Sequence, residues 1–354
     1  MENRVETILQ EIQSLSTQEI VFKEELILEA YNKNEKLGSS LMIKILSVIG
    51  GLFATSAFSS FLALAGIYES EFGMVFTGAI LVLASVLLNK KSEHIITDTF
   101  SVTSYIVGLS LFLFGMSWLG ETSLAILALL VGFSTLYLTQ HYILSFIATL
   151  VISASLFFNL IILNESYSVI HIYNTLIAIA MSFVFLFESN IITRSKKLSK
   201  LYNPVRIGLI ISFLFGLGVL RTRYLFDYEI NYTWFYSVVL FVILILIVNK
   251  ILNKLEVTAQ RIQIFAYLIS ASIFVLTAFS PSILGAVLLI LLSFYVNYRT
   301  GFILGLITLI FSVFQYYYDL NFTLLTKSIL LICSGVLFLA LYFLISKNKK
   351  NEEL

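Results

Sequence analysis

Residues 233–256 read TWFYSVVLFVILILIVNKILNKLE, a long uncharged and mostly apolar run that passes directly into a basic segment. A helix needs roughly 20 apolar residues to cross the hydrocarbon core of a bilayer, and loops rich in Lys and Arg stay preferentially in the cytoplasm. The same alternation of apolar run and polar linker recurs along most of the 354 residues. We therefore expect an all-α fold, a polytopic transmembrane helical bundle.

The composition agrees with a membrane protein and argues against several other classes. The chain is 59% hydrophobic and 12% charged, whereas soluble proteins average about 45–50% and about 25%. A soluble fold of this length could not bury so much apolar surface. The formal net charge of +1 gives no indication of a nucleic-acid partner. Cys333 is the only cysteine, so an intrachain disulfide is impossible.

About twelve apolar stretches are long enough, or nearly long enough, to cross a bilayer. They cover residues 42–67, 72–88, 99–119, 122–139, 142–163, 169–188, 205–226, 233–248, 262–279, 281–297, 301–318 and 322–345. Several are close to the lower limit of about 17 residues, so ten or eleven crossings remain open.

The distribution of cations predicts the orientation. If the amino terminus lies inside, all of the 22 Lys and Arg residues except Arg221, Arg223 and Lys327 fall in or beside cytoplasmic segments. Acidic residues lie on both sides, and the insertion bias depends on cations rather than on net charge. The sequence therefore predicts both termini in the cytoplasm.

This layout divides the chain into five parts. The predicted parts are a cytosolic helical lead (1–40), a first transmembrane half (41–190), a basic cytosolic loop (191–206), a second transmembrane half (207–346) and a cytosolic tail (347–354). Apolar residues of the lead, beginning with Val5 and Ile8, have helical spacing. The lead is net acidic, which favours a protein partner, or the chain's own loops, over anionic lipid.

The two halves are compatible with a parallel six-plus-six repeat. At an offset of 160 residues, Tyr68 and Glu69 align with Tyr228 and Glu229 at equivalent span ends. Such repeats usually place a transport site at their interface. Chance matching of boundary residues would give the same alignment, so both explanations stay open.

Small side chains predict where helices pack closely. Ser47, Gly51, Thr55, Ser59 and Ala63 recur every fourth residue of the first stretch, and Gly301 and Gly305 repeat that spacing near the carboxy terminus. A face of small residues lets two membrane helices approach each other closely. We expect the first stretch to lie inside the bundle rather than against lipid.

Ionisable groups at membrane depth are the first candidates for a substrate site, because an unpaired charge costs at least about 2.5–3.5 kcal/mol there. The predicted substrate-binding residues gather at the outer face: Lys327, Asp319, Arg221, Arg223, Tyr317 and Gln315. Guanidinium and ammonium groups in such a pocket would bind a phosphate or a carboxylate. Alternatively, Lys327 extends to the interface and the arginines pair with nearby acids.

The remaining ionisable groups predict neither a metal site nor a catalytic site. His94, His141 and His171 are scattered over both faces, which does not predict a metal site. Motifs of zinc peptidases, phosphate-binding loops and serine hydrolases are missing, so no catalytic residue and no cofactor is predicted. Glu188 is expected to pair with Arg194 or Lys196.

The region from Pro281 onward resembles a family of bacterial membrane proteins, domain of unknown function 4401. That family has an aromatic Y-Y-Y-x-L-x-x-T-L-L-x-K-S segment, matched here by Tyr316, Tyr317, Tyr318, Leu320, Thr323, Leu324, Leu325, Lys327 and Ser328. The resemblance implies the bacterial cytoplasmic (inner) membrane. It also implies, by analogy, a small membrane-anchored partner protein that carries a G-D-Y-x-x-L-x-Y motif.

Three functions remain open. The leading hypothesis is a carrier or permease-like component for a small or lipid-linked anionic substrate held by Lys327 and Arg221, with Asp319 setting the charge state of the lysine. The second is a membrane scaffold that assembles partners through the cytosolic lead. The third is a lipid-modifying transferase that uses Asp319 as a base.

Overall fold

The computed structural model describes residues 41–91, 95–164, 169–221, 233–256, 260–277 and 280–319, together with Ile332. Within these residues the secondary structure is helical and no strand is present, which confirms the all-α class. The chain forms two compact units, one ending at Gly115 and one beginning at Met116. The predicted cytosolic lead and all but Ile332 of the last apolar stretch lie outside the described residues.

The described residues of unit 1 form three long helices and one short one. They are α3 (Leu41–Leu64), η1 (Ile67–Glu69), α4 (Glu71–Lys91) and α5 (Ile95–Gly115). The chain turns between α3 and η1 at Gly66, whose φ of 75° suits a residue without a Cβ atom. Leu62, Val107 and Leu111 form a small buried cluster where α3 packs on α5.

Helices α4 and α5 pack so closely that their backbones touch. A Cβ atom added to Gly78 would lie 2.7 Å from the carbonyl oxygen of Gly108, and one on Gly115 would lie 2.8 Å from the amide nitrogen of Val75. Ser101 donates a buried hydrogen bond of 2.6 Å to the carbonyl of Ser85 across the same contact. Glycine therefore permits this contact, as expected of helices that pack in lipid.

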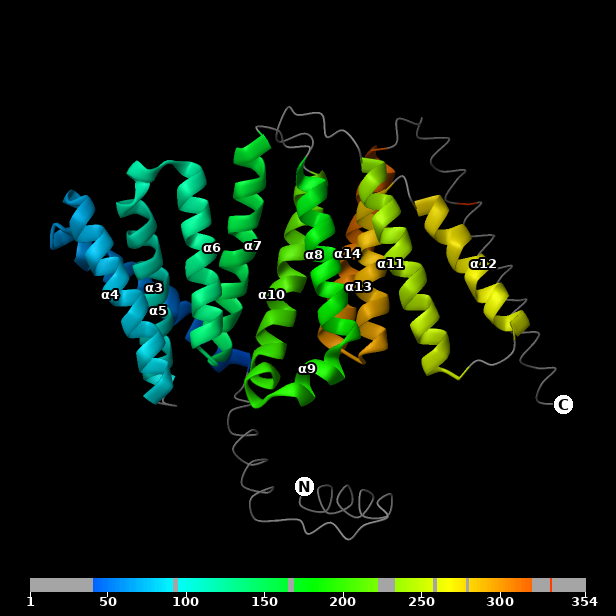
Figure 1. Cartoon of the computed structure of the whole chain (residues 1–354), viewed down its shortest axis with the longest axis horizontal. Helices are drawn as coiled ribbons and strands as arrows, with labels where there is room; N and C mark the ends of the chain where they lie inside the picture. The colour runs from blue at the N-terminus through cyan, green and yellow to red at the C-terminus, as the bar shows by residue number, and fades with distance from the viewer. Residues whose placement is uncertain are drawn as a thin grey trace, which may run out of the picture. The chain divides into compact units, whose positions relative to one another are not determined.

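Unit 2 contains the remaining helices. They are η2 (Ser117–Leu119), α6 (Glu121–Leu138), α7 (Tyr142–Asn164), α8 (Ile170–Leu186), α9 (Glu188–Arg194), α10 (Lys196–Arg221), α11 (Thr233–Lys254), α12 (Gln260–Thr277), α13 (Pro281–Tyr295) and α14 (Arg299–Asp319). Long helices of unit 2 run up and down beside one another, and α9 lies across the lower end between α8 and α10 (Figure 1).

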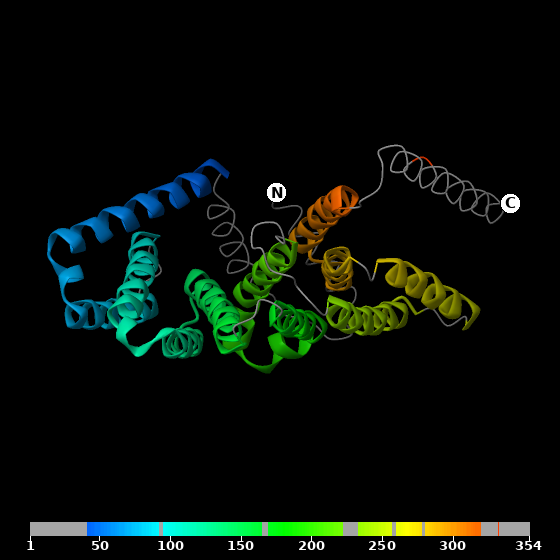
Figure 2. The same cartoon turned by 90° about the horizontal axis from the view of Figure 1, so that it is seen from above.

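The packing order in unit 2 differs from the chain order. Helix α10 packs against both α7 and α8, and α11 packs against both α8 and α13. Helix α13 lies between α11 and α14, as Figure 2 shows from above. The main apolar core therefore forms between α8, α10, α11 and α13.

Six described helices are long and apolar enough to cross a membrane: α4, α6, α7, α10, α11 and α14. Helices α8 and α9 would add a seventh if they form one span that bends by 69°. Many large apolar side chains are exposed, such as Leu64 at 90% and Phe72 at 78%. Such a surface suits contact with lipid tails better than contact with water.

The predicted apolar stretches, other than 322–345, each coincide with a helix, but one boundary differs clearly. Residues 191–206 were predicted as a basic loop, whereas α9 extends to Arg194 and α10 begins at Lys196. In the first turns of α10, lysines alternate with Leu198, Leu201 and Tyr202. Mean hydropathy stays low in such an amphipathic segment although the backbone is helical.

The predicted small-residue face of α3 is only partly described. Thr55 is partly buried and donates a hydrogen bond of 3.5 Å to Thr103 on α5. Ser59 is also partly buried, and Ala63 is exposed. The surroundings of Ser47 and Gly51 lie outside the described part of the structure.

Replacing Gly78 with Ala should destabilise the protein by about 1–3 kcal/mol, the usual cost of overpacking. The new methyl group would lie 2.5 Å from the Phe112 amide nitrogen, and a helix backbone cannot move aside cheaply. Thermal unfolding of the purified protein in detergent measures the effect. Gly50→Ala is the matched control, because no atom lies within 4 Å of its added Cβ. Equal melting temperatures for the two variants would contradict the proposed role of the close contact.

Candidate functional site

A buried arginine lies towards the end of unit 2 that is lower in Figure 1. Arg206 on α10 is only 8% exposed. One guanidinium nitrogen lies 3.4 Å from a carboxylate oxygen of Glu188 and 3.5 Å from the hydroxyl of Tyr202, and the other donates a hydrogen bond of 2.7 Å to the side chain of Asn203. The Nε atom of Arg206 is buried and makes no hydrogen bond with a described residue.

Aromatic rings complete the surroundings of Arg206. The guanidinium carbon lies 3.7 Å from the ring centre of Tyr298 and 4.9 Å from that of Tyr202. A cation over an aromatic face gains about 0.5–2 kcal/mol, more as it is desolvated. The carboxylate and the rings together offset much of the free-energy cost of burying this charge, which would be very large for an isolated charge.

The turn between α13 and α14 places Tyr298 over the arginine. Asn297 adopts a left-handed conformation with φ of 56°, and the amide of Tyr298 donates a 2.8 Å hydrogen bond to the carbonyl of Ser293. Gly301 is buried beside this turn, and a Cβ atom there would lie 2.7 Å from the Tyr298 ring. Gly305 lies at the same contact, against Ile290.

The partner of Glu188 differs from the prediction. The sequence suggested Arg194 or Lys196, the nearest cations along the chain, but the structure pairs Glu188 with Arg206. The reason is the 69° bend between α8 and α9, which begins directly before Glu188. The bend directs the carboxylate towards α10, while Arg194 lies at the far end of α9.

Further cations lie at this end of unit 2. Lys254 donates a 2.6 Å hydrogen bond to the carbonyl of Tyr295. Lys197 lies 3.8 Å from the ring centre of Tyr137, and Lys250 lies 5.1 Å from that of Phe187. These contacts join the ends of α6, α9, α10, α11 and α13, all at the lower end in Figure 1. Positive charge from segments far apart in sequence therefore collects at one end.

A cavity of about 540 Å³ opens at the same end, between α6, α8, α9 and α10. Its walls are mostly apolar and include Leu136, Val184, Ile191 and Val205. The polar side chains of its lining are Asn190 and Arg194 on α9 and Tyr202 on α10. The size lies within the range of about 300–1,000 Å³ that is usual for ligand sites.

A second buried polar cluster lies towards the other end of α8 and α10. The hydroxyl of Tyr173 lies 2.7 Å from that of Ser153 on α7 and donates to the carbonyl of Ser212 at 3.3 Å. Asn174 is fully buried and donates a 3.1 Å hydrogen bond to the carbonyl of Gly216, while its Oδ1 atom accepts none from a described residue.

His171 and Tyr236 extend this upper cluster to α11. Both side chains are almost completely buried, and their ring centres are 6.4 Å apart. The Tyr236 hydroxyl makes no hydrogen bond with a described residue. Buried hydroxyl and amide groups without full pairing, such as those of Tyr236 and Asn174, are uncommon in protein interiors, so this cluster is a candidate site for a polar ligand.

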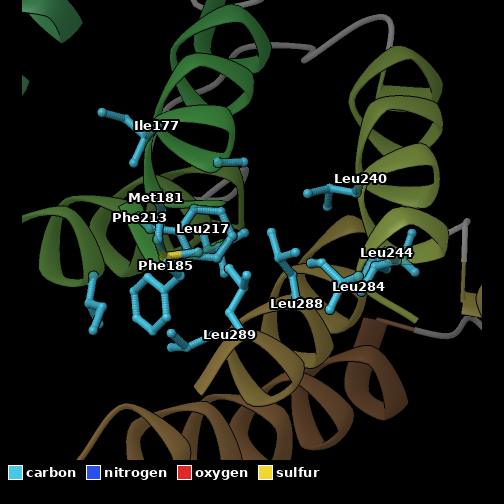
Figure 3. Close-up of a cluster of buried hydrophobic side chains, with 14 of the residues drawn as sticks. Ile177, Met181, Phe185, Phe213, Leu217, Leu240, Leu244, Leu284, Leu288 and Leu289 are labelled. Carbon is cyan, nitrogen blue, oxygen red and sulfur yellow. The ribbon is translucent and has the colours of Figure 1, made fainter. Parts of the chain in front are cut away.

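An apolar layer separates the two polar clusters. Figure 3 shows side chains from α8, α10, α11 and α13 meeting in this layer, among them Met181, Phe213, Leu240 and Leu288. Along α10, Arg206 is six residues from Ser212 and ten from Gly216, which corresponds to about 9 Å and about 15 Å at 1.5 Å per residue. The clusters are therefore about a third to a half of a hydrocarbon core apart, given its thickness of about 30 Å.

The structure describes only part of the predicted outer pocket. Gln315 and Tyr317 are partly buried near the end of α14. Arg221 is the last residue of α10 and Asp319 the last of α14, but their side chains lie outside what the structure describes. Arg223 and Lys327 lie outside the described residues. The outer pocket therefore stays a prediction.

The residues of the two observed clusters were not predicted from the sequence. Arg206 was assigned to a basic loop, because three lysines and an arginine precede it within a dozen residues. His171 was considered only as a metal ligand, and within the described ranges no three His, Cys, Asp or Glu residues are placed to hold a metal ion. The signal that could have found the upper cluster is His171 and Asn174, two polar residues three positions apart in an apolar run.

Replacing Glu188 with Ala should destabilise the protein, because the Arg206 charge would stay buried without its partner. Breaking a buried pair costs about 3–5 kcal/mol, and the low end applies since the carboxylate is 31% exposed. Thermal unfolding in detergent measures the loss. A double variant, Glu188→Leu with Arg206→Met, should recover much of it. No recovery would show that packing, rather than the unpaired charge, explains the effect.

Replacing Gly216 with Ala should disturb the upper cluster. The new methyl group would overlap the Oδ1 atom of Asn174 and lie 2.9 Å from the Tyr173 ring. The buried hydrogen bond of Asn174 would be lost, at a cost of about 1–3 kcal/mol. Gly218→Ala on the same helix is the control, since no atom lies within 4 Å of its added Cβ. A similar drop in melting temperature for both variants would contradict the assignment.

Comparison with known proteins identifies the family of the chain. The family model described as Domain of unknown function (DUF4401) matches residues 40–348, which include every described helix. No curated protein matches, and no solved structure matches. The chain therefore belongs to the family described as Domain of unknown function (DUF4401).

Proposed function

We propose that this protein is an integral membrane protein of the bacterial cytoplasmic membrane and acts as a carrier- or permease-like component for a small or lipid-linked anionic substrate. Six described helices with the length and composition of membrane spans, and the apolar side chains exposed on them, support membrane insertion. The proposed layout has about twelve spans in two parallel halves and both termini in the cytoplasm.

The orientation rests on where unit 2 carries its cations. Lys197, Arg206, Lys250 and Lys254 all lie at its lower end, and cationic segments remain preferentially in the cytoplasm. We assign this end to the cytoplasmic face. The upper cluster around Asn174 then lies in the outer half of the membrane.

The observation that carries the proposal is the pair of buried polar clusters on α8 and α10 with an apolar layer between them. Ionisable and amide groups inside membrane helices are expensive, and they commonly mark the path of a substrate. Two buried polar clusters separated by apolar side chains are the arrangement expected of a carrier in a state with no open path between the two sides of the membrane. A change in the packing of α8 and α10 would be needed to connect them.

The guanidinium group of Arg206 is the feature that favours an anionic substrate. The Nε atom of Arg206 is an unused donor on a permanently charged group, and guanidinium groups bind phosphates and carboxylates well. On the outer face, Lys327 and Arg221 would hold the same anion before or after it crosses, with Asp319 setting the charge state of the lysine. Tyr317, Gln315 and Arg223 would complete that pocket.

Purified full-length protein in liposomes tests the proposal with two probes. The first is phosphatidylglycerol with a fluorescent acyl chain, whose movement is followed by chemical reduction of the label in the outer leaflet. The second is radiolabelled inorganic phosphate, followed as uptake. We expect the protein to speed movement of one probe, and Arg206→Gln to slow it by about tenfold, equivalent to 1.4 kcal/mol.

The exposed Lys200 supplies the matched control, because Lys200→Gln removes a charge from the same helix without touching either cluster. Melting temperatures of both variants establish that they are folded. A lipid-linked substrate predicts movement of the first probe and a small anion predicts movement of the second. If neither probe moves faster than in protein-free liposomes, the carrier proposal is wrong, and a scaffold becomes the better account.

A further inference from the structure

The cavity beside α9 has the shape and the charge of a site for an anionic membrane lipid. We propose that one acyl chain of such a lipid lies in this cavity and that Arg194 binds its phosphate. The site adjoins the Arg206 cluster through Tyr202, which also lines the cavity, and it would exist whether or not the protein moves a substrate.

Apolar side chains make up most of the cavity lining. They include Ile191 on α9, Val205 on α10, Leu136 on α6 and Val184 on α8. The rings of Phe183 and Phe187 are 4.8 Å apart and also line the cavity. A hydrocarbon chain gains free energy in such surroundings, whereas a small hydrophilic ligand would find few partners.

The mouth of the cavity is polar and cationic. Arg194 is exposed and makes no ion pair with a described residue, whereas the acid on the same helix, Glu188, is already occupied by Arg206. Asn190 adds an amide that can donate to a phosphate or glycerol oxygen. The charge at the mouth thus complements a lipid headgroup with a negative phosphate.

The bend before α9 places the opening of the cavity beside residues that are typical of the membrane's headgroup layer. Helix α8 ends at Leu186, and α9 turns away from it by 69°. Phe187 lies at the bend with Lys250 5.1 Å from its ring centre. Aromatic rings and lysines are typical of the layer where headgroups meet acyl chains. A lipid of the adjacent leaflet could therefore place one acyl chain in the cavity while its headgroup stays level with those of neighbouring lipids.

Charge complementarity selects an anionic lipid over a zwitterionic one. Each cation near an anionic membrane surface contributes about 1 kcal/mol, which corresponds to about fivefold in affinity. With Arg194 as the main contact, phosphatidylglycerol should bind about fivefold more tightly than phosphatidylcholine with the same acyl chains. A selectivity of this size is measurable and depends on a single exposed side chain.

The test uses delipidated full-length protein in detergent, offered equal amounts of the two lipids and analysed by native mass spectrometry. Wild-type protein should retain phosphatidylglycerol preferentially, and Arg194→Gln should remove the preference while Arg194→Lys keeps it. Lys200→Gln, a cation outside the cavity lining, should leave it unchanged. Equal retention of both lipids by the wild type, or an unchanged preference in Arg194→Gln, would refute the proposal.

A second pair of variants tests the acyl-chain part of the site. Ile191→Trp fills the cavity and should abolish retention of both lipids, whereas Ile192→Trp changes a neighbouring exposed residue outside the lining and should not. A photoactivatable phosphatidylglycerol should crosslink to residues 183–205. Crosslinks confined to other parts of the chain would place the lipid elsewhere and overturn the assignment. These readouts measure binding alone, so they can succeed even if the transport experiment fails.

Discussion

The bend between α8 and α9 is the feature on which the lower end of unit 2 depends. A straight continuation of α8 would carry Glu188 past the end of the bundle and leave Arg206 buried without a carboxylate. The 69° change of direction instead brings the acid to within 3.4 Å of the guanidinium. The same change lays α9 against α10 and forms the wall of the cavity. One local geometry thus produces both an ion pair and an apolar site.

The polar groups of unit 2 follow the rule that lipid imposes on buried charge and on backbone. Helices satisfy the backbone internally, so a span can be apolar all round and remain stable. Side chains such as Arg206 and Asn174 must instead find partners on neighbouring helices. Their partners determine which helices pack together, and the glycines on α10 and α14 make room for that packing. Polar pairing and close packing therefore act together to fix the order of the helices.

The helices were predictable from the sequence, and the site was not. Long apolar runs such as residues 233–248 imply helices because a helix satisfies its backbone hydrogen bonds within one continuous segment in lipid. The resemblance to the DUF4401 family, read from the carboxy-terminal motif, is confirmed over residues 40–348. In the Arg206 cluster, Tyr202 lies four residues before Arg206 on the same helix, as helical spacing predicts. No spacing rule relates Arg206 to Glu188 or to Tyr298, which come from a bend before it and a turn far along the chain. Its burial depends on tertiary contacts that hydropathy does not encode.

Gly301 connects the α13–α14 hairpin to the chemistry of the buried arginine. Because no Cβ atom intervenes, the Tyr298 ring lies against this helix as well as over the guanidinium. The ring therefore covers one face of the guanidinium, and the close contact at Gly301 ties the register of the α13–α14 turn to the burial of a charge on α10.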